Sequence, residues 1–367
     1  MKAQRTDFWS VRDLARLLIE PDIGERFSPA TESGRGVLVL DLAAGSELPA
    51  ESDRAAILDI LPTLPCVTVA IAGHRMPEPL EAMARACDVL LHDGGEVGPF
   101  LSAFERTPVS ALAFVQLLRK SLSTSIQAGL VAESFAYSTL QAGREFQDWL
   151  ARYSSSRSGR HGSVGAPSSG GIGGAAEPNC RIVRDGARLR ICLNRRDRHN
   201  AFSRAMRDEL VEALGVAIAD ASIREVVLAG DGPSFCSGGD LDEFGTFLDP
   251  AQAHVVRITR SPAWSIARLA GRIRTEVQGA CIGAGIELPA FTDHIVANGD
   301  ARFRLPEIGL GLVPGAGGTV SLPRRIGRQR TAWLGLSGRT IDAETALDWG
   351  LVDEVRLGQH LTTEGQG

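Results

Sequence analysis

The stretch that decides the fold reads G-A-C-I-G-A-G-I-E from Gly279 to Glu287 and L-P-E-I-G-L-G-L-V-P-G-A-G-G-T from Leu305 to Thr319. Another glycine-rich segment, F-C-S-G-G-D-L from Phe235 to Leu241, precedes both, so it is the first of three glycine loops in chain order. Glycine loses more backbone entropy on folding than any other residue, so three such loops indicate that the backbone must approach something closely. Backbone N–H groups aimed at a polarised oxygen, with a carboxylate nearby, can stabilise an enolate and move a proton beside it.

The second half of the chain resembles the enoyl-CoA hydratase/isomerase (crotonase) superfamily from about Cys180 to Val355. The resemblance begins at N-R-R-D-R-H-N-A-F-S-R-A-M-R-D-E-L (Asn194 to Leu210), continues through the three glycine loops and ends at A-L-D-W-G-L-V-D-E-V (Ala346 to Val355). The order and spacing of these segments carry the resemblance, because one glycine loop alone is weak evidence. It implies an α/β fold, the crotonase-like (ClpP/crotonase) spiral of β-β-α units.

Composition excludes several classes of protein. The chain has 367 residues, of which 44% are hydrophobic and 23% charged, and its formal net charge is -5. These values are typical of a soluble globular protein and argue against non-specific nucleic-acid binding. The six cysteines form no CxxC pair and no metal-ligand spacing, so we expect reduced thiols and no metal site. The chain shows no long apolar run and no signal-peptide pattern, so we expect a cytoplasmic protein without a membrane partner.

A glycine- and serine-rich stretch from Ser154 to Pro178 divides the chain. It contains almost no large apolar residues and cannot bury a core, so we interpret residues 153–178 as a flexible linker. Neither a strand before it nor a Lys-Ser/Thr pair after it supports a phosphate-binding loop. The predicted domains are therefore a β/α region in residues 1–152, a catalytic core in residues 179–357 and a polar tail in residues 358–367.

Short apolar runs alternate with helical patterns in the first half, which predicts a β/α arrangement. The predicted strands are Val37–Leu42, Cys66–Ala72 and Asp88–His92, and the predicted helices between them are Ala55–Leu61 and Leu80–Ala86. Long amphipathic helices follow in residues 108–152, with breaks expected only at Gly129 and Gly143.

This first half resembles a degenerate crotonase unit, which would make the fold a duplication. V-A-I-A-G-H (Val69 to His74) and A-C-D-V-L (Ala86 to Leu90) match family segments on either side of the second glycine loop. R-M-P-E-P-L (Arg75 to Leu80) stands where the family has glycines and a glutamate. We therefore interpret the first half as non-catalytic.

The second half also shows a β/α pattern. Its predicted elements are a helix at about Ser203 to Asp220 and strands at Leu189–Leu193, Glu225–Ala229, Arg274–Val277, His294–Ala297 and Arg302–Arg304. In the family, further helices follow the segment that matches Ala346 to Val355, but here only a short polar stretch remains. We expect the helices at Ser110 to Leu150 to cover the site instead, within one chain or across a subunit boundary.

The resemblance assigns an oxyanion hole to the backbone N–H groups of Gly239 and Ala284. Such donors stabilise the thioester enolate more than the ground state. Both positions carry small residues, as a backbone donor requires. The alternative is that Gly238 and Gly239 only make a turn before a helix capped near Asp240.

Glu287 and Glu307 match the two positions where hydratases of the family carry their glutamates. Hydration needs one carboxylate that takes a proton from water and an acid that delivers one to the α-carbon. The alternative is a pair of surface glutamates, the common environment of this residue. Against this, both stand in apolar sequence, where an unpaired carboxylate is costly.

Further substrate contacts follow from motif position. The resemblance implies that the ligand is bound by Ser237, Gly238, Asp240, Leu241, Gly283 and Gly315. The variable segment from Asp242 to Arg260 either lines the acyl pocket or packs as a helix on the core; its apolar candidates are Phe244, Phe247, Leu248, Val255 and Ile258.

The remaining chemically notable residues favour structural interpretations. His199 matches a position that varies in the family, so we expect a surface or CoA-proximal histidine. Cys236 lacks a partner histidine at a diagnostic position and is expected to be a small buried thiol. Arg195, Arg196 and Arg198 either meet CoA phosphates or form a solvated basic turn.

Together these features predict an enoyl-CoA hydratase, which adds water reversibly across the 2,3 double bond of a 2-enoyl-CoA. Coenzyme A would be part of the substrate, with no metal or redox cofactor, and the resemblance implies a trimer or hexamer. Two alternatives stay open: an isomerase or other enolate-forming enzyme of the same fold, and a non-catalytic acyl-CoA-binding protein.

Overall fold

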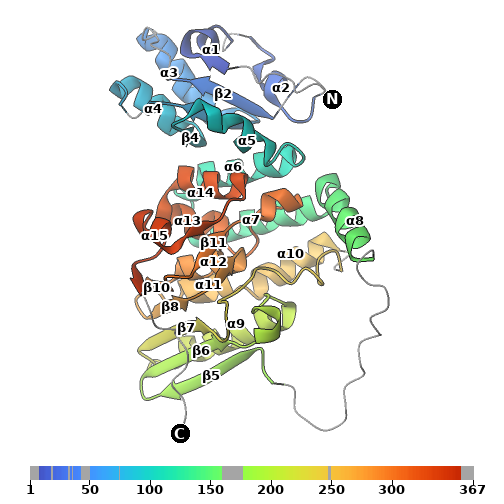
Figure 1. Cartoon of the computed structure of the whole chain (residues 1–367), viewed down its shortest axis with the longest axis vertical. Helices are drawn as coiled ribbons and strands as arrows, with labels where there is room; N and C mark the ends of the chain where they lie inside the picture. The colour runs from blue at the N-terminus through green and yellow to red at the C-terminus, as the bar shows by residue number, and fades with distance from the viewer. Residues whose placement is uncertain are drawn as a thin grey trace.

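The computed structural model describes residues 8–17, 20–31, 34, 36–42, 50–73, 75–158, 177–246 and 249–356. Figure 1 shows the first half of the chain at the top and the second half below it. Helices α6 (Pro108–Ser121) and α7 (Ile126–Gln141) belong to the first half, yet they lie against the second half in the middle of the molecule.

The first half is an α/β region built on a four-stranded sheet. All neighbouring strands are parallel, in the order β1-β2-β3-β4: Phe8–Ser10, Val37–Asp41, Val67–Ile71 and Val89–Leu91. The other helices of this region are α1 Val11–Leu17, α2 Ile23–Phe27, α3 Glu51–Ile60, α4 Glu78–Ala86, α5 Val97–Ser102 and α8 Arg144–Ser158. The three strands and two helices predicted before residue 108 are thus confirmed. The uninterrupted apolar runs reflect a parallel sheet covered on both faces.

The two faces of this sheet contribute to different cores. Leu38 and Leu40 face a core that contains residues of α1, α3 and α4. Val39 and Val69 face a second core, which they share with Phe114 of α6 and with residues of the second half such as Leu336. The hydrophobic core is therefore continuous between the two halves.

The prediction of a helix break at Gly129 is wrong. Helix α6 ends at Ser121, and α7 begins at Ile126, where the Ser125 hydroxyl accepts a hydrogen bond from the Ala128 N–H at 3.2 Å. This N-cap fixes the start of α7, and Gly129 lies inside its first turn. The predicted break at Gly143 is confirmed, because this residue separates α7 from α8.

Helix α8 continues to Ser158, beyond residue 153 where we expected the linker to begin. Residues 159–176 and 357–367 lie outside the described part of the chain. The expected linker and polar tail therefore remain predictions over those residues.

The second half contains two sheets. The larger has the order β13-β10-β8-β7-β6-β5; β5 and β6 are antiparallel, and the other neighbours are parallel. Its strands are β5 Cys180–Asp185, β6 Arg188–Leu193, β7 Glu225–Gly230, β8 Ile273–Val277, β10 His294–Asn298 and β13 Glu354–Arg356. The smaller sheet consists of β9 Ala280–Ile282, β11 Arg302–Arg304 and β12 Ile341–Asp342.

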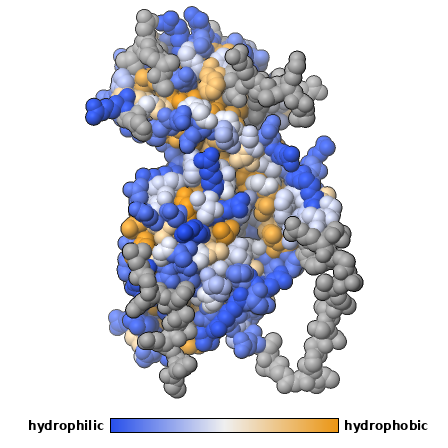
Figure 2. All heavy atoms as spheres, in the orientation of Figure 1, coloured by the Kyte–Doolittle hydropathy of each residue, from blue (hydrophilic) through white to orange (hydrophobic). Residues whose placement is uncertain are grey.

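Helices complete the second half, and its predicted helix and five strands are confirmed. The helices are α9 Arg204–Ala219, α10 Pro250–Thr259, α11 Pro262–Ala267, α12 Ala284–Glu287, α13 Gly318–Ile326, α14 Arg328–Ser337 and α15 Ala343–Asp348. On the face shown in Figure 2, hydrophilic residues dominate the second half and hydrophobic ones are scattered among them. Among the helices that the structure describes, none is both long and apolar enough to span a membrane.

Candidate active site

The first two glycine loops lie side by side. The backbones of Cys236 and Cys281 pair in a parallel β-bridge. In it the Ile282 N–H donates to the Cys236 carbonyl at 2.9 Å. Gly238 and Gly283 both have positive φ angles, +95° and +51°, which favour glycine. This pairing brings the segment that contains Gly239 next to the first turn of α12.

The backbone N–H groups of Gly239 and Ala284 are free of protein acceptors among the described hydrogen bonds. Phe202 donates its N–H to the Gly238 carbonyl and accepts from the Asp240 N–H, so the N–H of the intervening Gly239 points to the other side. Ala284 is the first residue of α12, and the N–H of a first helical residue has no intrahelical acceptor. These two groups therefore can act as the donor pair that the resemblance implies.

Glu287 is the last residue of α12 and is only 2% exposed. Its Oε2 accepts hydrogen bonds from the N–H groups of Ala316 at 2.7 Å and Gly318 at 2.9 Å. The interpretation of Glu287 as a surface residue is therefore wrong. The carboxylate holds the third glycine loop at the start of α13.

Glu307 opens a 3₁₀-helix, η5 (Glu307–Leu310). The residue is partly exposed, but its Oε2 is buried and has no hydrogen-bond partner within the described part of the chain. A Cβ atom at Gly283 would lie 2.4 Å from Glu307 Oε1, so only glycine fits beside this carboxylate. Glu307 therefore lies directly against the second glycine loop.

Both carboxyl groups have raised pKa values. Burial raises the pKa of Glu307 to about 7 and that of Glu287 well above its usual value of 4.5. The negative charge of Glu307 adds to the shift of Glu287. Because the two sites are coupled, the pair can hold one proton and one negative charge near neutral pH.

A cavity of about 360 Å³ is lined by Gly239, Ala284 and the two glutamates. Six of the ten predicted site residues line it: Gly239, Asp240, Ala284, Glu287, Glu307 and Gly315. The other four do not. Gly238 and Gly283 are buried beside the cavity as turn residues, Ser237 donates to the Arg198 carbonyl, and Leu241 is exposed.

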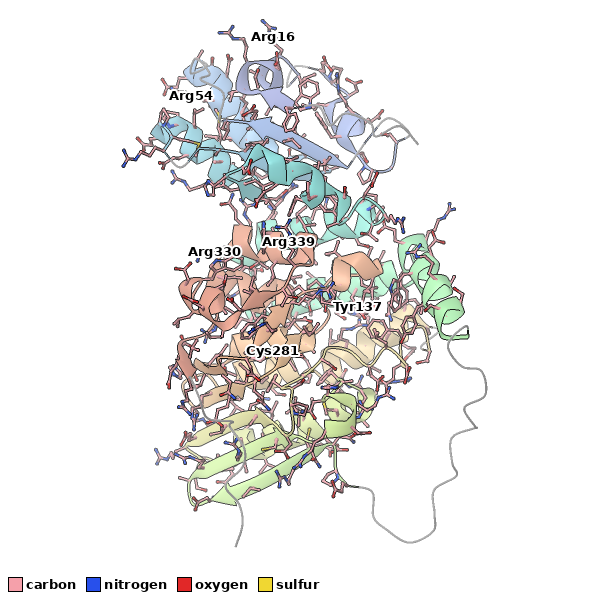
Figure 3. All side chains as sticks on the ribbon, in the orientation of Figure 1. Arg16, Arg54, Tyr137, Cys281, Arg330 and Arg339 are labelled. Carbon is pink, nitrogen blue, oxygen red and sulfur yellow. The ribbon has the colours of Figure 1, made fainter. Side chains whose placement is uncertain are left out.

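Helix α7 of the first half supplies residues that the sequence analysis missed. Tyr137 and Gln141 line the cavity, and Figure 3 shows Tyr137 near the middle of the molecule. Glu133, one turn earlier, is 2% exposed and reaches α13. Its Oε1 accepts from the Gly317 N–H at 2.7 Å, and its Oε2 accepts from the Thr319 N–H at 2.9 Å and the Thr319 hydroxyl at 2.6 Å. A glutamate on an otherwise apolar helical face was the signal that could have revealed it.

Helix α10 forms another part of the cavity wall. Ala253, Val256 and Arg257 line the cavity, together with Phe244 from the preceding turn. Of the apolar candidates in this segment, Phe244 is therefore confirmed as a lining residue. The prediction that Val255 and Ile258 line the pocket is wrong, because they lie on the exposed face of α10. Phe247 and Leu248 lie outside the described residues.

The arginines near Asn200 form ion pairs within the protein. Arg195 and Arg198 pair with the buried Asp240 at 2.9 and 3.3 Å. Arg196 lies 3.6 Å from Asp231. Asp240 therefore binds Arg195 and Arg198 at the edge of the cavity. No helix begins at Asp240, since residues 241–246 form turns and bends.

The structural interpretations of the histidine and the cysteine fit the structure. The His199 ring contacts the Ser234 hydroxyl at 3.1 Å. Cys236 is buried, and burial raises its thiol pKa to about 12, which leaves it a poor nucleophile. Within the described residues, no group of three His, Cys, Asp or Glu side chains is arranged to hold a metal ion.

Comparisons with known proteins identify the second half. Residues 185–364 match the family model described as enoyl-CoA hydratase/isomerase, so this region has the α/β crotonase fold. A mevalonyl-coenzyme A hydratase of Beauveria bassiana is 35% identical over 46% of this chain and 62% of its own length. A 2,3-dehydroadipyl-CoA hydratase of Escherichia coli is 38% identical over 46% of this chain and 65% of its own length.

A 1,2-epoxyphenylacetyl-CoA isomerase of Escherichia coli is 33% identical over 48% of this chain and 73% of its own length. The three relatives named above are two hydratases and an isomerase of CoA compounds. The chain belongs to the enoyl-CoA hydratase/isomerase (crotonase) family through its C-terminal half. It spans less than two thirds of the length of either hydratase above.

Proposed function

We propose that the protein is an enoyl-CoA hydratase that adds water reversibly across the 2,3 double bond of a 2-enoyl-CoA. The observation that carries this proposal is the common cavity of Glu287, Glu307 and the backbone at Gly239 and Ala284. Hydration requires an oxyanion site, a base and an acid within reach of one substrate, and these residues offer all three.

In this mechanism the thioester carbonyl oxygen accepts hydrogen bonds from the N–H groups of Gly239 and Ala284. These bonds strengthen as the oxygen gains charge in the enolate. The ionised member of the glutamate pair takes a proton from water as it attacks the β-carbon. The protonated member delivers a proton to the α-carbon, and the pair returns to its starting state after proton exchange.

The raised pKa values support this assignment. A carboxyl group with its usual pKa would be ionised at neutral pH and could not act as the acid. Burial of Glu287 and Glu307 keeps one proton available without removing the charge that the base requires.

We further propose that the first half completes the site within the same chain. Helix α7 lines the cavity through Tyr137 and Gln141 and binds the start of α13 through Glu133. This half would be a degenerate, non-catalytic crotonase unit. In support, β2, β3 and β4 are consecutive parallel neighbours, as β7, β8 and β10 are in the second half. A trimeric or hexameric assembly is part of the same proposal and is tested by light scattering.

An isomerase of the same fold is the second candidate, favoured by the similarity to the epoxyphenylacetyl-CoA isomerase. Mass spectrometry of crotonyl-CoA and longer 2-enoyl-CoAs incubated with the protein in H₂¹⁸O separates the possibilities. A hydratase forms 3-hydroxyacyl-CoA that contains one heavy oxygen. A shifted double bond without oxygen uptake would indicate an isomerase, and saturable binding without any product would indicate a binding protein.

A further inference from the structure

The cavity wall contains a guanidinium group for which the described residues provide no acidic partner. Arg257 of α10 lines the cavity beside Glu287 and Glu307. Its hydrogen bonds within the described part of the chain all go to uncharged oxygens on α7, at 3.1–3.3 Å: Ser134 O, Ser134 Oγ, Ser138 Oγ and Gln141 Oε1. No described carboxylate forms an ion pair with it. Arg257 is half-buried, and an arginine that is even partly removed from water usually has such a partner.

The guanidinium group is held in place by α7. Its Cζ atom lies 4.3 Å from the centre of the Tyr137 ring, in a cation–π contact. The N–H groups of the same guanidinium donate to the serines and to Gln141. Desolvation lowers the pKa of Arg257, so the protein environment does not compensate its charge fully.

Glu133 is a candidate counterion, because its negative charge opposes the lowering of the Arg257 pKa. However, both of its oxygens are directed at α13. Oε1 binds the Gly317 N–H, and Oε2 binds the Thr319 N–H and hydroxyl. Glu133 therefore attracts Arg257 at a distance without satisfying its donors.

A second cation makes the wall more positive. Arg207 of α9 lines the same cavity, and its charge is one of the causes that lower the Arg257 pKa. Its carboxylate partner, Asp208, also binds Arg260 and is shared between the two arginines. Arg204 lines the cavity too but is paired with Glu243. Two guanidinium groups that repel each other across a cavity are stabilised by an anion between them.

We propose that Arg257 binds a carboxylate at the distal end of the acyl group, so that the substrate is the 2-enoyl-CoA thioester of a dicarboxylic acid. This inference rests on the proposed binding of an acyl-CoA in the cavity. Phe202, Phe244 and Val256 line the same cavity and supply apolar contacts for the methylene groups between the thioester and the carboxylate. The planar guanidinium fork matches a carboxylate in two parallel hydrogen bonds.

Calorimetric titration with unreactive thioesters tests the proposal. Octanoyl-CoA is compared with the CoA monothioester of the dicarboxylic acid of the same chain length, and with its ω-amide as a neutral polar control. The proteins are the wild type, Arg257→Met, Arg257→Lys and, as a matched control, Arg268→Met, which removes an exposed arginine that does not line the cavity. Free CoA and dephospho-CoA are titrated in parallel, because a CoA phosphate offers the same anionic chemistry.

We expect the wild type to bind the ω-carboxylate at least about tenfold more tightly than octanoyl-CoA or the amide, as a desolvated charge pair allows. Arg268→Met should keep this preference, Arg257→Lys should keep part of it, and Arg257→Met should lose it. The proposal is overturned if the wild type shows no preference, or if Arg257→Met weakens octanoyl-CoA or free CoA as much as the ω-carboxylate.

Hydration of the corresponding 2-enoyl thioesters, measured in parallel, separates this inference from the proposed function. Binding that prefers the carboxylate but is followed by no hydration would refute the hydratase and leave the anion subsite. Hydration of both thioesters with equal kcat/KM would support the hydratase and refute the subsite.

Discussion

Two buried glutamates from different halves of the chain hold one short segment of backbone. Glu287 accepts hydrogen bonds from the N–H groups of Ala316 and Gly318, and Glu133 accepts from those of Gly317 and Thr319. These groups stand at the start of α13, where backbone N–H groups lack intrahelical acceptors and the helix dipole favours negative charge. Glu133 is therefore a positioning residue for the loop that holds Glu287.

Glu133→Gln should change the pH dependence of catalysis as well as its rate. Burial raises the pKa of Glu133 itself to about 7. When Glu133 is ionised, its negative charge raises the pKa values of Glu287 and Glu307, so removing it should lower both. We expect the kcat/KM profile of the variant to shift toward lower pH.

Glu145→Gln is the matched control for Glu133→Gln. The Glu145 carboxylate binds the N–H groups of Val109 and Ser110 and the Ser110 hydroxyl at the start of α6, and it does not line the cavity. The Glu145→Gln variant should be less stable than the wild type, but the pH profile of its kcat/KM should be unchanged. An unchanged profile in Glu133→Gln would show that Glu133 has only a structural role.

Glu307 should make folding stability depend on pH. Its pKa is raised from 4.5 to about 7 in the folded protein, so the folded state binds the proton more tightly than the unfolded state. The stabilisation from this proton is complete below about pH 4.5 and is lost as the pH rises through 7. Glu307→Gln should therefore reduce the loss of unfolding free energy between about pH 5 and pH 8 by roughly 1–3 kcal/mol.

Urea unfolding at the two pH values measures this difference, with the exposed Glu344→Gln as the control. If Glu307→Gln loses as much stability as the wild type over this range, Glu307 does not retain its proton in the folded state.

At the scale of elements, α7 packs closely on α13. A Cβ atom at Gly129 would lie 2.8 Å from Val320 Cγ2, and Gly129 is buried. Glycine at this position permits the approach that brings Glu133 to α13. The sequence analysis interpreted this glycine as a helix break, because the packing partner lies in the other half of the chain and leaves no local pattern.

Gly129→Ala should destabilise the protein by about 1–3 kcal/mol through overpacking, although alanine is the better helix former. Gly215 provides the control, since nothing lies within 4 Å of an added Cβ in the middle of α9. Gly215→Ala should stabilise by about 0.5–1 kcal/mol. Thermal unfolding distinguishes the two. Stabilisation of the protein by Gly129→Ala would contradict the close packing. So would a destabilisation that a second change, Val320→Ala, does not relieve.

The elements that the sequence predicted are those with a local pattern. The sequence predicted the strands β2, β3, β4, β6, β7, β8, β10 and β11 and the helices α3, α4 and α9. The strands β1, β5, β9, β12 and β13 were missed because their partners, rather than their own residues, define them. For the same reason the glycine loops identified Glu287 and Glu307, whereas Glu133, Tyr137 and Arg257 became visible only when α7 and α10 came together.

At the scale of the whole molecule, the two halves are joined by polar contacts as well as by a shared core. Asp88 of the first half binds Arg328 of α14 at 3.1 Å, and it also pairs with Arg119 of its own half at 2.6 Å. Arg328 also donates to the Cys87 carbonyl at 2.9 Å. Breaking a buried charge pair leaves an uncompensated charge, so separating the halves is costly.

A protease site introduced among residues 159–176 tests this organisation. After cleavage, the two pieces should elute together from a sizing column and keep their activity. The second piece, separated under denaturing conditions and refolded alone, should lose at least about 100-fold in kcat, because misplacing catalytic groups is that costly. Adding the first piece should restore activity. A second piece that is stable and fully active alone would contradict the proposed role of the first half.

The account depends most on the assignment of Glu287 and Glu307 as the acid–base pair of a hydratase. The direct measurement is the loss of absorbance of the conjugated thioester when crotonyl-CoA or a longer 2-enoyl-CoA meets the wild type, Glu287→Gln, Glu307→Gln and the control Glu344→Gln. We predict turnover by the wild type and the control, and a decrease of at least about 100-fold in kcat for each of the other two variants. Saturable binding without turnover by the wild type, or near-normal turnover by either of those variants, would contradict the account.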